Sequence, residues 1–135
     1  MMRRLFALAL TALLSTGCTL AQARNLYIAG AAADITTTEV ALNNGLEEAN
    51  PLWKNVEHPG IPSAAITAAS IGFAEWAVAK NPKNEEAAIW FYRALATVRW
   101  TAAILNTGRL IEHQNEENAE QAQRRGIRAT WRVVW

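Results

Sequence analysis

The placement of proline restricts the fold of this chain more than any other feature of its sequence. All four prolines lie in two short stretches, three of them between positions 51 and 62 and the fourth at 82. Proline lacks a backbone N–H and clashes with the preceding helical turn, so it is excluded from helix interiors. The stretches between the prolines are rich in alanine, which favours helices over strands. The sequence therefore predicts an all-α fold.

Three helical stretches are expected to form the core. Their limits are about 26–44, 62–80 and 85–107, and an irregular loop is expected over 47–61. Gly45 is the expected C-cap of the first stretch, because glycine adopts the left-handed conformation without a Cβ penalty. Asn84, followed by Glu85 and Glu86, is typical of a helix N-terminus.

The last part of the chain differs in composition from the rest. Gly108 is expected to end the third helix, and a more polar helix is expected to follow until Gly126 breaks it. Residues 109–135 thus form a polar C-terminal helix with a tail of arginine and tryptophan, next to a helical core over 24–108.

The N-terminus is typical of a bacterial export signal over residues 1–23. Two arginines, Arg3 and Arg4, precede an uncharged apolar run over 5–14 that is too short for a typical membrane span. Two processing sites compete. Residues 14–18 resemble a lipobox, in which Cys18 would be lipidated and become the first residue. Alternatively, the small-x-small pattern Ala21-Gln22-Ala23 predicts a cut before Arg24. An uncleaved anchor helix is a third interpretation.

Four charged residues in otherwise apolar helices raise the question of whether the helices lie in a membrane or in water. Asp34 and Glu39 lie in the first helix, and Arg93 and Arg99 lie in the third. Each would cost roughly 2.5–3.5 kcal/mol at the centre of an isolated spanning helix. Either these acids and arginines offset each other inside a bundle, or they mark a water-facing surface. Hydropathy alone favours the second interpretation.

The second helix, over 62–80, is long enough to cross a bilayer and carries small residues at helical spacing. Ala64, Ala68 and Gly72 are expected to let another helix approach closely. Alanine is also simply a common helix former. Tryptophans near the helix ends, Trp76 and Trp90, suit a membrane interface as well as core packing.

The most specific pattern combines the first helix with the loop after it. Its members are Asp34, Thr37, Thr38, Gly45, Glu48, Asn50 and Pro51. The pattern resembles the D-x-x-T and G-x-x-E-x-N-P signature of a bacterial family of short multi-helix membrane proteins without an assigned activity. Arg93, Arg99 and Asn106 of the later helix add to the resemblance, which covers about residues 30–107. It implies a membrane location and no particular chemistry.

The same residues have a physical interpretation of their own. We expect Asp34 to pair with Arg93 or Arg99 across helices, and the helical hydroxyls of Thr37 and Thr38 to bond back to carbonyls one turn earlier. Glu48, Asn50 and Pro51 are expected to brace the loop. The alternative is a polar pocket between helices that binds a small ion or ligand.

No catalytic motif, cofactor motif or metal-ligand pattern is recognisable in the chain. The two histidines, His58 and His113, each lie beside a glutamate but belong to no metal-binding spacing. The only cysteine is Cys18, and a net charge of +1 gives no basic field to attract nucleic acid. We therefore expect a non-enzyme that uses no cofactor or metal and does not bind nucleic acid.

These observations predict a structural or interaction component of the bacterial cell envelope. Its expected partners are membrane lipids together with an envelope protein of unknown kind, and its expected place is the inner membrane or the periplasm. The first alternative is a soluble, lipid-anchored periplasmic binding module. The second is a small transport-associated protein that passes ions or protons along Asp34, Glu39, Arg93 and Arg99.

Overall fold

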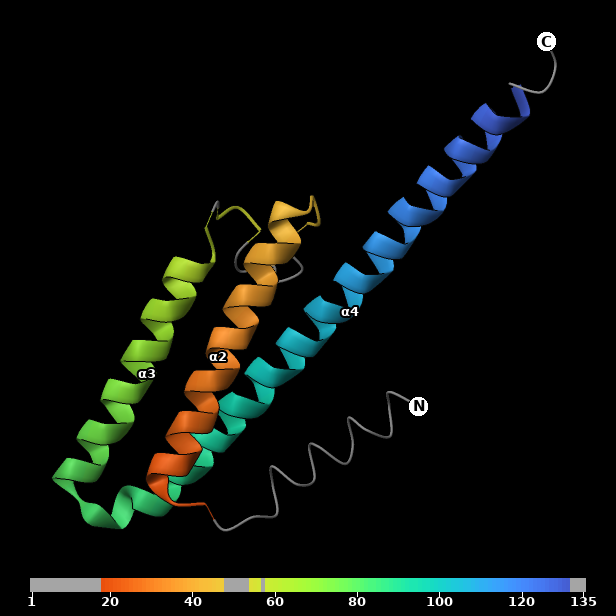
Figure 1. Ribbon diagram of the computed structural model, residues 1–135. Coiled ribbons are helices and arrows are strands. Elements are labelled where there is room, and N and C mark those ends of the chain that lie inside the picture. The colour runs from red at the N-terminus through yellow and green to blue at the C-terminus, as the bar shows by residue number, and fades with distance from the viewer. Residues whose placement is uncertain (1–17, 48–53, 57, 132–135) are drawn as a thin grey trace.

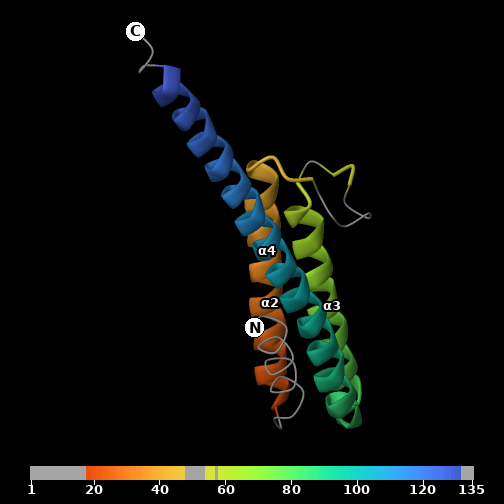
Figure 2. The ribbon, with the colours of Figure 1, turned by 90° about the vertical axis from the view of Figure 1, so that its right-hand side faces the viewer.

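The computed structural model describes residues 18–47, 54–56 and 58–131, with side chains as far as Gly126. Within these ranges it contains α2 (Leu20–Asn43), α3 (Gly60–Lys80), the short 3-10 helix η1 (Pro82–Asn84) and α4 (Glu85–Trp131), and no strand. The predicted all-α fold with a three-helix core is confirmed. Successive helices run in opposite directions, and α4 continues far beyond the other two (Figures 1 and 2).

The end of α2 agrees with the sequence prediction and its start does not. At the C-terminal end, Gly45 adopts a φ of 80°. The Gly45 N–H donates to Leu42 O and the Leu46 N–H donates to Ala41 O, which is the Schellman arrangement. The start was expected near 26 but lies at Leu20, because Thr19 and Gln22 form a capping box that satisfies the first N–H groups of the helix.

The turn between α3 and α4 is held by two asparagine side chains. Asn81 Oδ1 accepts from the Lys83 N–H at 3.1 Å and so caps η1. Asn84 was expected as the N-cap of α4, and its side-chain Nδ2 donates to Ala77 O at 2.9 Å. The turn is thereby tied to the last residues of α3.

The prediction that the third helix ends at Gly108 is wrong. α4 is a single helix of 47 residues that passes through both Gly108 and Gly126, a length of about 70 Å at 1.5 Å per residue. Glycine costs a helix only about 1 kcal/mol relative to alanine. Past Gly108, Leu110 is buried, Arg109 Nη2 donates to Glu47 O at 3.1 Å just after α2, and His113 Nε2 lies 3.0 Å from Asn44 O, the C-cap of α2. These tertiary contacts outweigh that cost.

The core of the bundle is narrow and consists of alanine and tyrosine. Its buried residues are Ala23, Tyr27, Ala31, Ala74, Ala88, Tyr92 and Ala96. The rings of Tyr27 and Tyr92 stack with their centroids 6.0 Å apart. A Cβ on Gly30 would lie 2.9 Å from Trp100 Cδ1, so only glycine fits there without a shift of the indole. Small residues therefore bring α2 and α4 into close contact.

The surface of the bundle is apolar. This is the opposite of a water-soluble helical bundle, in which polar side chains cover the surface. The exposed large apolar residues on the three helices are Ile28, Val40, Ile61, Ile66, Phe73, Trp76, Trp90, Phe91, Val98, Ile104, Leu105 and Ile111. All the Asp, Glu, Lys and Arg residues in 20–46, 60–79 and 87–111 are buried or half-buried. The charges thus lie between the helices and the apolar side chains lie outside.

The small residues of α3 lie on its exposed face. Ala64, Ala68 and Gly72 are exposed, and a Cβ on Gly72 would meet no atom within 4 Å. The helix instead contacts the core through Ala74 and the half-buried Ile71 and Val78. The close approach predicted for the small residues does not occur with α2 or α4.

Candidate functional site

A buried ion pair lies at the centre of the polar interior. Arg99 Nη1 of α4 donates to Asp34 Oδ2 of α2 at 2.8 Å, and the two side chains are 17% and 14% exposed. Of the two arginines considered for Asp34, Arg99 is therefore the one that contacts it. A charge-assisted bond of this length in a partly dehydrated site is stronger than a neutral hydrogen bond.

The Arg99 guanidinium also contacts α3. Arg99 Nη1 donates to Ser63 Oγ at 2.7 Å, and Nη2 lies 3.4 Å from Ser63 O and 3.3 Å from Thr67 Oγ1. The Thr67 hydroxyl donates in turn to Ser63 O at 2.9 Å, which leaves its oxygen lone pairs for the arginine. Arg99 thus joins α2, α3 and α4 through one planar group with fixed donors.

Two further contacts continue the polar interior toward the 44–59 loop. Asn106 Nδ2 of α4 donates to Thr38 Oγ1 of α2 at 2.8 Å. The Gly60 N–H, at the start of α3, donates to Glu39 Oε1 at 3.0 Å. A carboxylate at a helix N-terminus satisfies a free N–H and interacts favourably with the helix dipole. A Cβ on Gly60 would lie 2.7 Å from the same oxygen, so a larger residue would displace the Glu39 carboxylate from this position.

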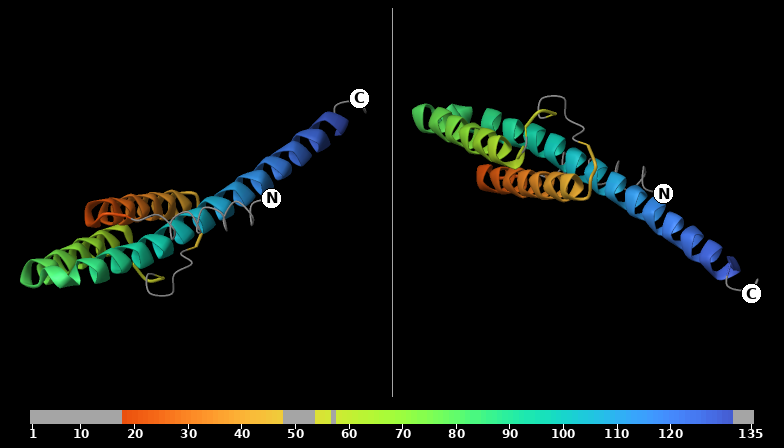
Figure 3. Two further views of the ribbon diagram at one scale, coloured as in Figure 1. Left: turned by 90° about the horizontal axis from the view of Figure 1, so that it is seen from below. Right: turned by 90° about the horizontal axis from the view of Figure 1, so that it is seen from above.

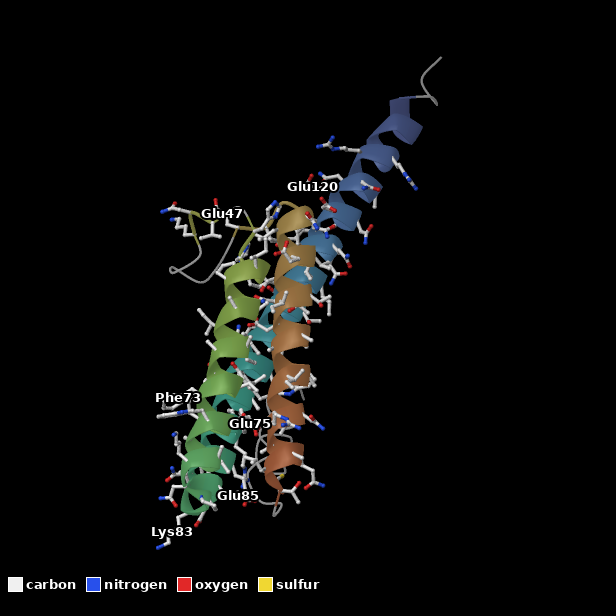
Figure 4. The ribbon with its side chains drawn as sticks, turned by 90° about the vertical axis from the view of Figure 1, so that its left-hand side faces the viewer. Glu47, Phe73, Glu75, Lys83, Glu85 and Glu120 are labelled. Atoms are coloured by element: carbon white, nitrogen blue, oxygen red, sulfur yellow. The ribbon has the colours of Figure 1, made fainter. Side chains whose placement is uncertain are left out.

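A second polar group lies at the opposite end of the bundle, near the turn between α3 and α4. Arg24 Nη1 of α2 lies 3.2 Å from Glu75 Oε1 of α3. The Tyr92 hydroxyl of α4 donates to the same carboxylate oxygen at 3.2 Å. Glu75 therefore receives one donor from each neighbouring helix. Figure 4 shows Glu75 partway along the bundle, between Phe73 and Glu85.

The remaining predicted site residues lie apart from these two polar groups or outside the described residues. Arg93 is 7% exposed, and its guanidinium carbon lies 4.5 Å from the centre of the Trp90 ring, within the range of a cation–π contact. The Thr37 hydroxyl donates to Ala33 O at 2.9 Å, one turn earlier, as expected. Cys18 is half-buried and packs against the core. Glu48, Asn50 and Pro51 lie outside the described residues.

Five side chains of these polar groups were not expected from the sequence: Ser63, Thr67, Glu75, Arg24 and Tyr92. Ser63 and Thr67 lie four residues apart and hence on one face of α3, which is a weak signal in a chain with many such pairs. Glu75 offered a clearer one, because it is the only acid in a helix that is otherwise nearly free of charge. An isolated acid of this kind predicts an arginine or tyrosine partner on a neighbouring helix.

An apolar recess lies between α3 and α4, beside their connecting turn. Its volume is about 260 Å³, and its lining residues are Phe73, Ala74, Ala77, Asn84, Ala87, Ala88 and Phe91. Apart from the Asn84 amide, which already donates to Ala77 O, the lining offers no polar side chain. Among the residues that the structure describes, no group of three His, Cys, Asp or Glu side chains comes close enough to hold a metal ion.

Comparison of the chain with protein families, with curated proteins and with solved structures gave no match of any of the three kinds.

Proposed function

We propose that the chain is a non-enzymatic structural or interaction component of the bacterial envelope, held in the membrane by α2, α3 and the first half of α4. The observation that supports this most directly is the inverted surface of the bundle. Its apolar side chains face outward while its charged side chains pair inward, as intramembrane charges do. Water would favour the reverse arrangement.

The dimensions of the helices fit a bilayer. α3 has 21 residues, and it is the one helix among the described residues that is long and apolar enough to cross a membrane by itself. Its length of about 31 Å matches a hydrocarbon core of about 30 Å. Only 17% of its apolar stretch is buried against the rest of the bundle, whereas the core helix of a soluble protein is mostly buried.

The other two helices need their neighbours to lie in a membrane. α2 carries Asp34 and α4 carries Arg99, and either charge alone would oppose insertion. Their 2.8 Å contact offsets the two charges, and Ser63 and Thr67 of α3 supply further acceptors.

Charged residues border the apolar surface at both ends, which is where a bilayer has its head groups. Lys83 and Glu85 lie at one end of the bundle, and Glu47 lies at the other (Figure 4). Exposed Trp76 and Trp90 flank the first of these ends in sequence, and tryptophan is enriched at membrane interfaces. We therefore place one interface near the turn between α3 and α4, and the other near the 44–59 loop.

Beyond the second interface α4 becomes a charged helix with few neighbours among the described residues; His113 Nε2, 3.0 Å from Asn44 O, contacts the end of α2. Seen from below and from above, it runs on past α2 and α3 (Figure 3). Nearly all of its residues from Glu112 to Gly126 are exposed, and the contacts of Arg124 with Glu120 and of His113 with Glu117 lie within the helix itself. A helix that is polar all round fits a segment that projects into water toward a partner. We propose an envelope protein as that partner.

The contacts of the buried carboxylates favour structure over transport. Asp34 is engaged by Arg99, and Glu39 accepts from the first N–H of α3. A proton or ion path needs carboxylates that exchange partners, whereas these two hold helices together.

Site-specific cysteine labelling in membrane vesicles tests the proposal. Val98→Cys places a thiol in the centre of the apolar surface, where the native side chain is 65% exposed, and Glu116→Cys places one in the projecting part of α4. Unaltered protein gives the background due to Cys18. A membrane-impermeant maleimide should label Glu116→Cys from one side of the vesicle and label Val98→Cys only after detergent is added.

A soluble, lipid-anchored module would give a different result. Both thiols would then react at similar rates without detergent, since both positions are exposed in the bundle itself. Equal labelling, or release of the chain from membranes by alkaline carbonate after removal of any attached lipid, would refute a spanning bundle.

A further inference from the structure

We infer that the mature chain begins at Cys18, so that residues 18–23 belong to the folded protein and the competing cut after Ala23 is not used. The inference rests on the proposed export of the chain, but it does not require α2, α3 and α4 to cross a membrane. The start of α2 in the bundle argues against the cut after Ala23, and the lipobox-like order of residues 14–18 indicates a cut before Cys18.

The N-terminal end of α2 is a complete helix start. The Gln22 N–H donates to Thr19 Oγ1 at 3.3 Å, and the Thr19 N–H donates to Gln22 Oε1 at 2.9 Å. The Ala23 N–H donates to Thr19 O at 3.0 Å as the first bond of the helix ladder. This reciprocal cap satisfies groups that a helix otherwise leaves free. A discarded signal has no use for such a cap.

The residues after the cap form part of the tertiary core. Ala23 has no exposed surface, and Cys18 and Leu20 pack against the same buried cluster of alanines and tyrosines. Tyr27, which is 1% exposed, lies one helical turn after Ala23. A cut after Ala23 would remove the carbonyl that accepts from the Tyr27 N–H, at a position shielded from water.

The same cut would also create an unfavourable charge. Arg24 would become the first residue, and its new α-ammonium group would lie at a helix N-terminus, where the helix dipole disfavours positive charge. Arg24 already contributes a guanidinium there, which contacts Glu75 at 3.2 Å. The N-terminus of α2 would thus lose its cap and carry a second positive charge beside the Arg24 guanidinium.

Hydrolysis of the peptide bond before Cys18 keeps the cap of α2 and its core contacts. Water adds across the amide, residue 17 leaves as a carboxylate and Cys18 keeps the new ammonium group. The cut precedes the N-cap residue Thr19, so α2 keeps every contact described above. The lipobox-like order of residues 14–18 is the sequence pattern that marks this bond for cleavage.

The test is the mass of the processed protein. The full chain, with a C-terminal affinity tag, is produced in a bacterium and purified, and its intact mass and N-terminal peptide are determined by mass spectrometry. We expect a first residue at position 18, with the mass of any lipid on Cys18 read from the same spectrum. A chain that starts at Arg24, or one that still starts at Met1, would overturn the inference.

Two substitutions separate the competing sites. Ala21 is exposed, so Ala21→Leu destroys the small-x-small pattern without disturbing the core. We expect the same first residue in this variant, whereas accumulation of the uncut chain would show that the later site is the one in use. Cys18→Ala should instead leave the chain uncut, and normal processing of this variant would also contradict the inference.

A separate measurement tests whether residues 18–23 stabilise the fold. Chains that begin at residues 18 and 24 are produced without a signal and compared by thermal unfolding. The shorter chain should have a Tm lower by about 5 °C or more, given its lost cap and core contacts. Equal Tm values would show that residues 18–23 add nothing to the fold.

Discussion

Neutralising Asp34 should destabilise the bundle mainly by leaving Arg99 buried without its counter-charge. Breaking one side of a buried ion pair typically costs about 3–5 kcal/mol. Arg99 would keep its contacts with Ser63 and Thr67 and is 17% exposed, so we expect the lower end of that range. Asp34→Asn should therefore reduce the free energy of unfolding by about 3 kcal/mol.

The double-mutant cycle isolates the contribution of the pair. Arg99→Met alone should cost about as much as Asp34→Asn, because it leaves a buried carboxylate unpaired. In the double variant neither charge remains, so we expect a loss of about 4 kcal/mol rather than about 6, and hence a coupling energy of about 2 kcal/mol. Unfolding of the detergent-solubilised protein, followed by circular dichroism, supplies the three differences.

The Arg24–Glu75 pair is the matched control in the same bundle. Its side chains are 37% and 38% exposed and its N–O distance is 3.2 Å. A pair this accessible should have a coupling energy below about 1 kcal/mol. If the losses at Asp34 and Arg99 instead add to within about 0.5 kcal/mol, the two charges do not stabilise each other and our account of the interior is wrong.

Further substitutions test packing, capping and surroundings. Gly30→Ala should destabilise the fold by about 1–2 kcal/mol, because its Cβ would meet the Trp100 ring at 2.9 Å. Gly72→Ala has open space around it and should stabilise the fold by about 0.5–1 kcal/mol in the same thermal unfolding assay. A gain in stability at both positions would contradict the close approach of α2 and α4. Glu39→Ala should cost about 1 kcal/mol by removing the acceptor of the first N–H of α3, and an unchanged Tm would refute that cap. Val98→Lys should reduce the amount of protein recovered in membranes, since a lysine at the bilayer centre costs roughly 2.5–3.5 kcal/mol, and unchanged recovery would indicate a water-facing surface.

Local rules predicted those helix ends that depend on short-range contacts. Gly45 ends α2 in the left-handed conformation, as expected from its position after a helical stretch. The start of α2 lies earlier than predicted, because the predicted export signal overlaps a capping box formed by Thr19 and Gln22. The helix continues past Gly108 because Arg109 and His113 contact Glu47 and Asn44 at and just after the end of α2, which are distant in sequence.

The sequence predicted that buried charges would pair between helices, but it did not predict which arginine would contact Asp34. Charged residues in apolar helices need partners, which pointed to Asp34 and to an arginine of the third helix. Arg93 and Arg99 are six positions apart, so at about 100° per residue they face different sides of α4. Only the rotation of that helix against α2 decides that Arg99 meets Asp34, and rotation depends on the packing of small core residues that sequence patterns do not specify.

The unbroken course of α4 gives the bundle a lever arm. Leu110 is the last residue of α4 found buried, and the helix continues to Trp131 without an interruption that could act as a hinge. That outer arm is about 30 Å long at 1.5 Å per residue, so a tilt of roughly 10° at its base would move its tip by about 5 Å. Because α4 is one continuous helix, a force that a partner applies at the tip would be transmitted to the part of α4 that carries Arg99, and a small tilt inside the bundle would give a larger displacement at the far end.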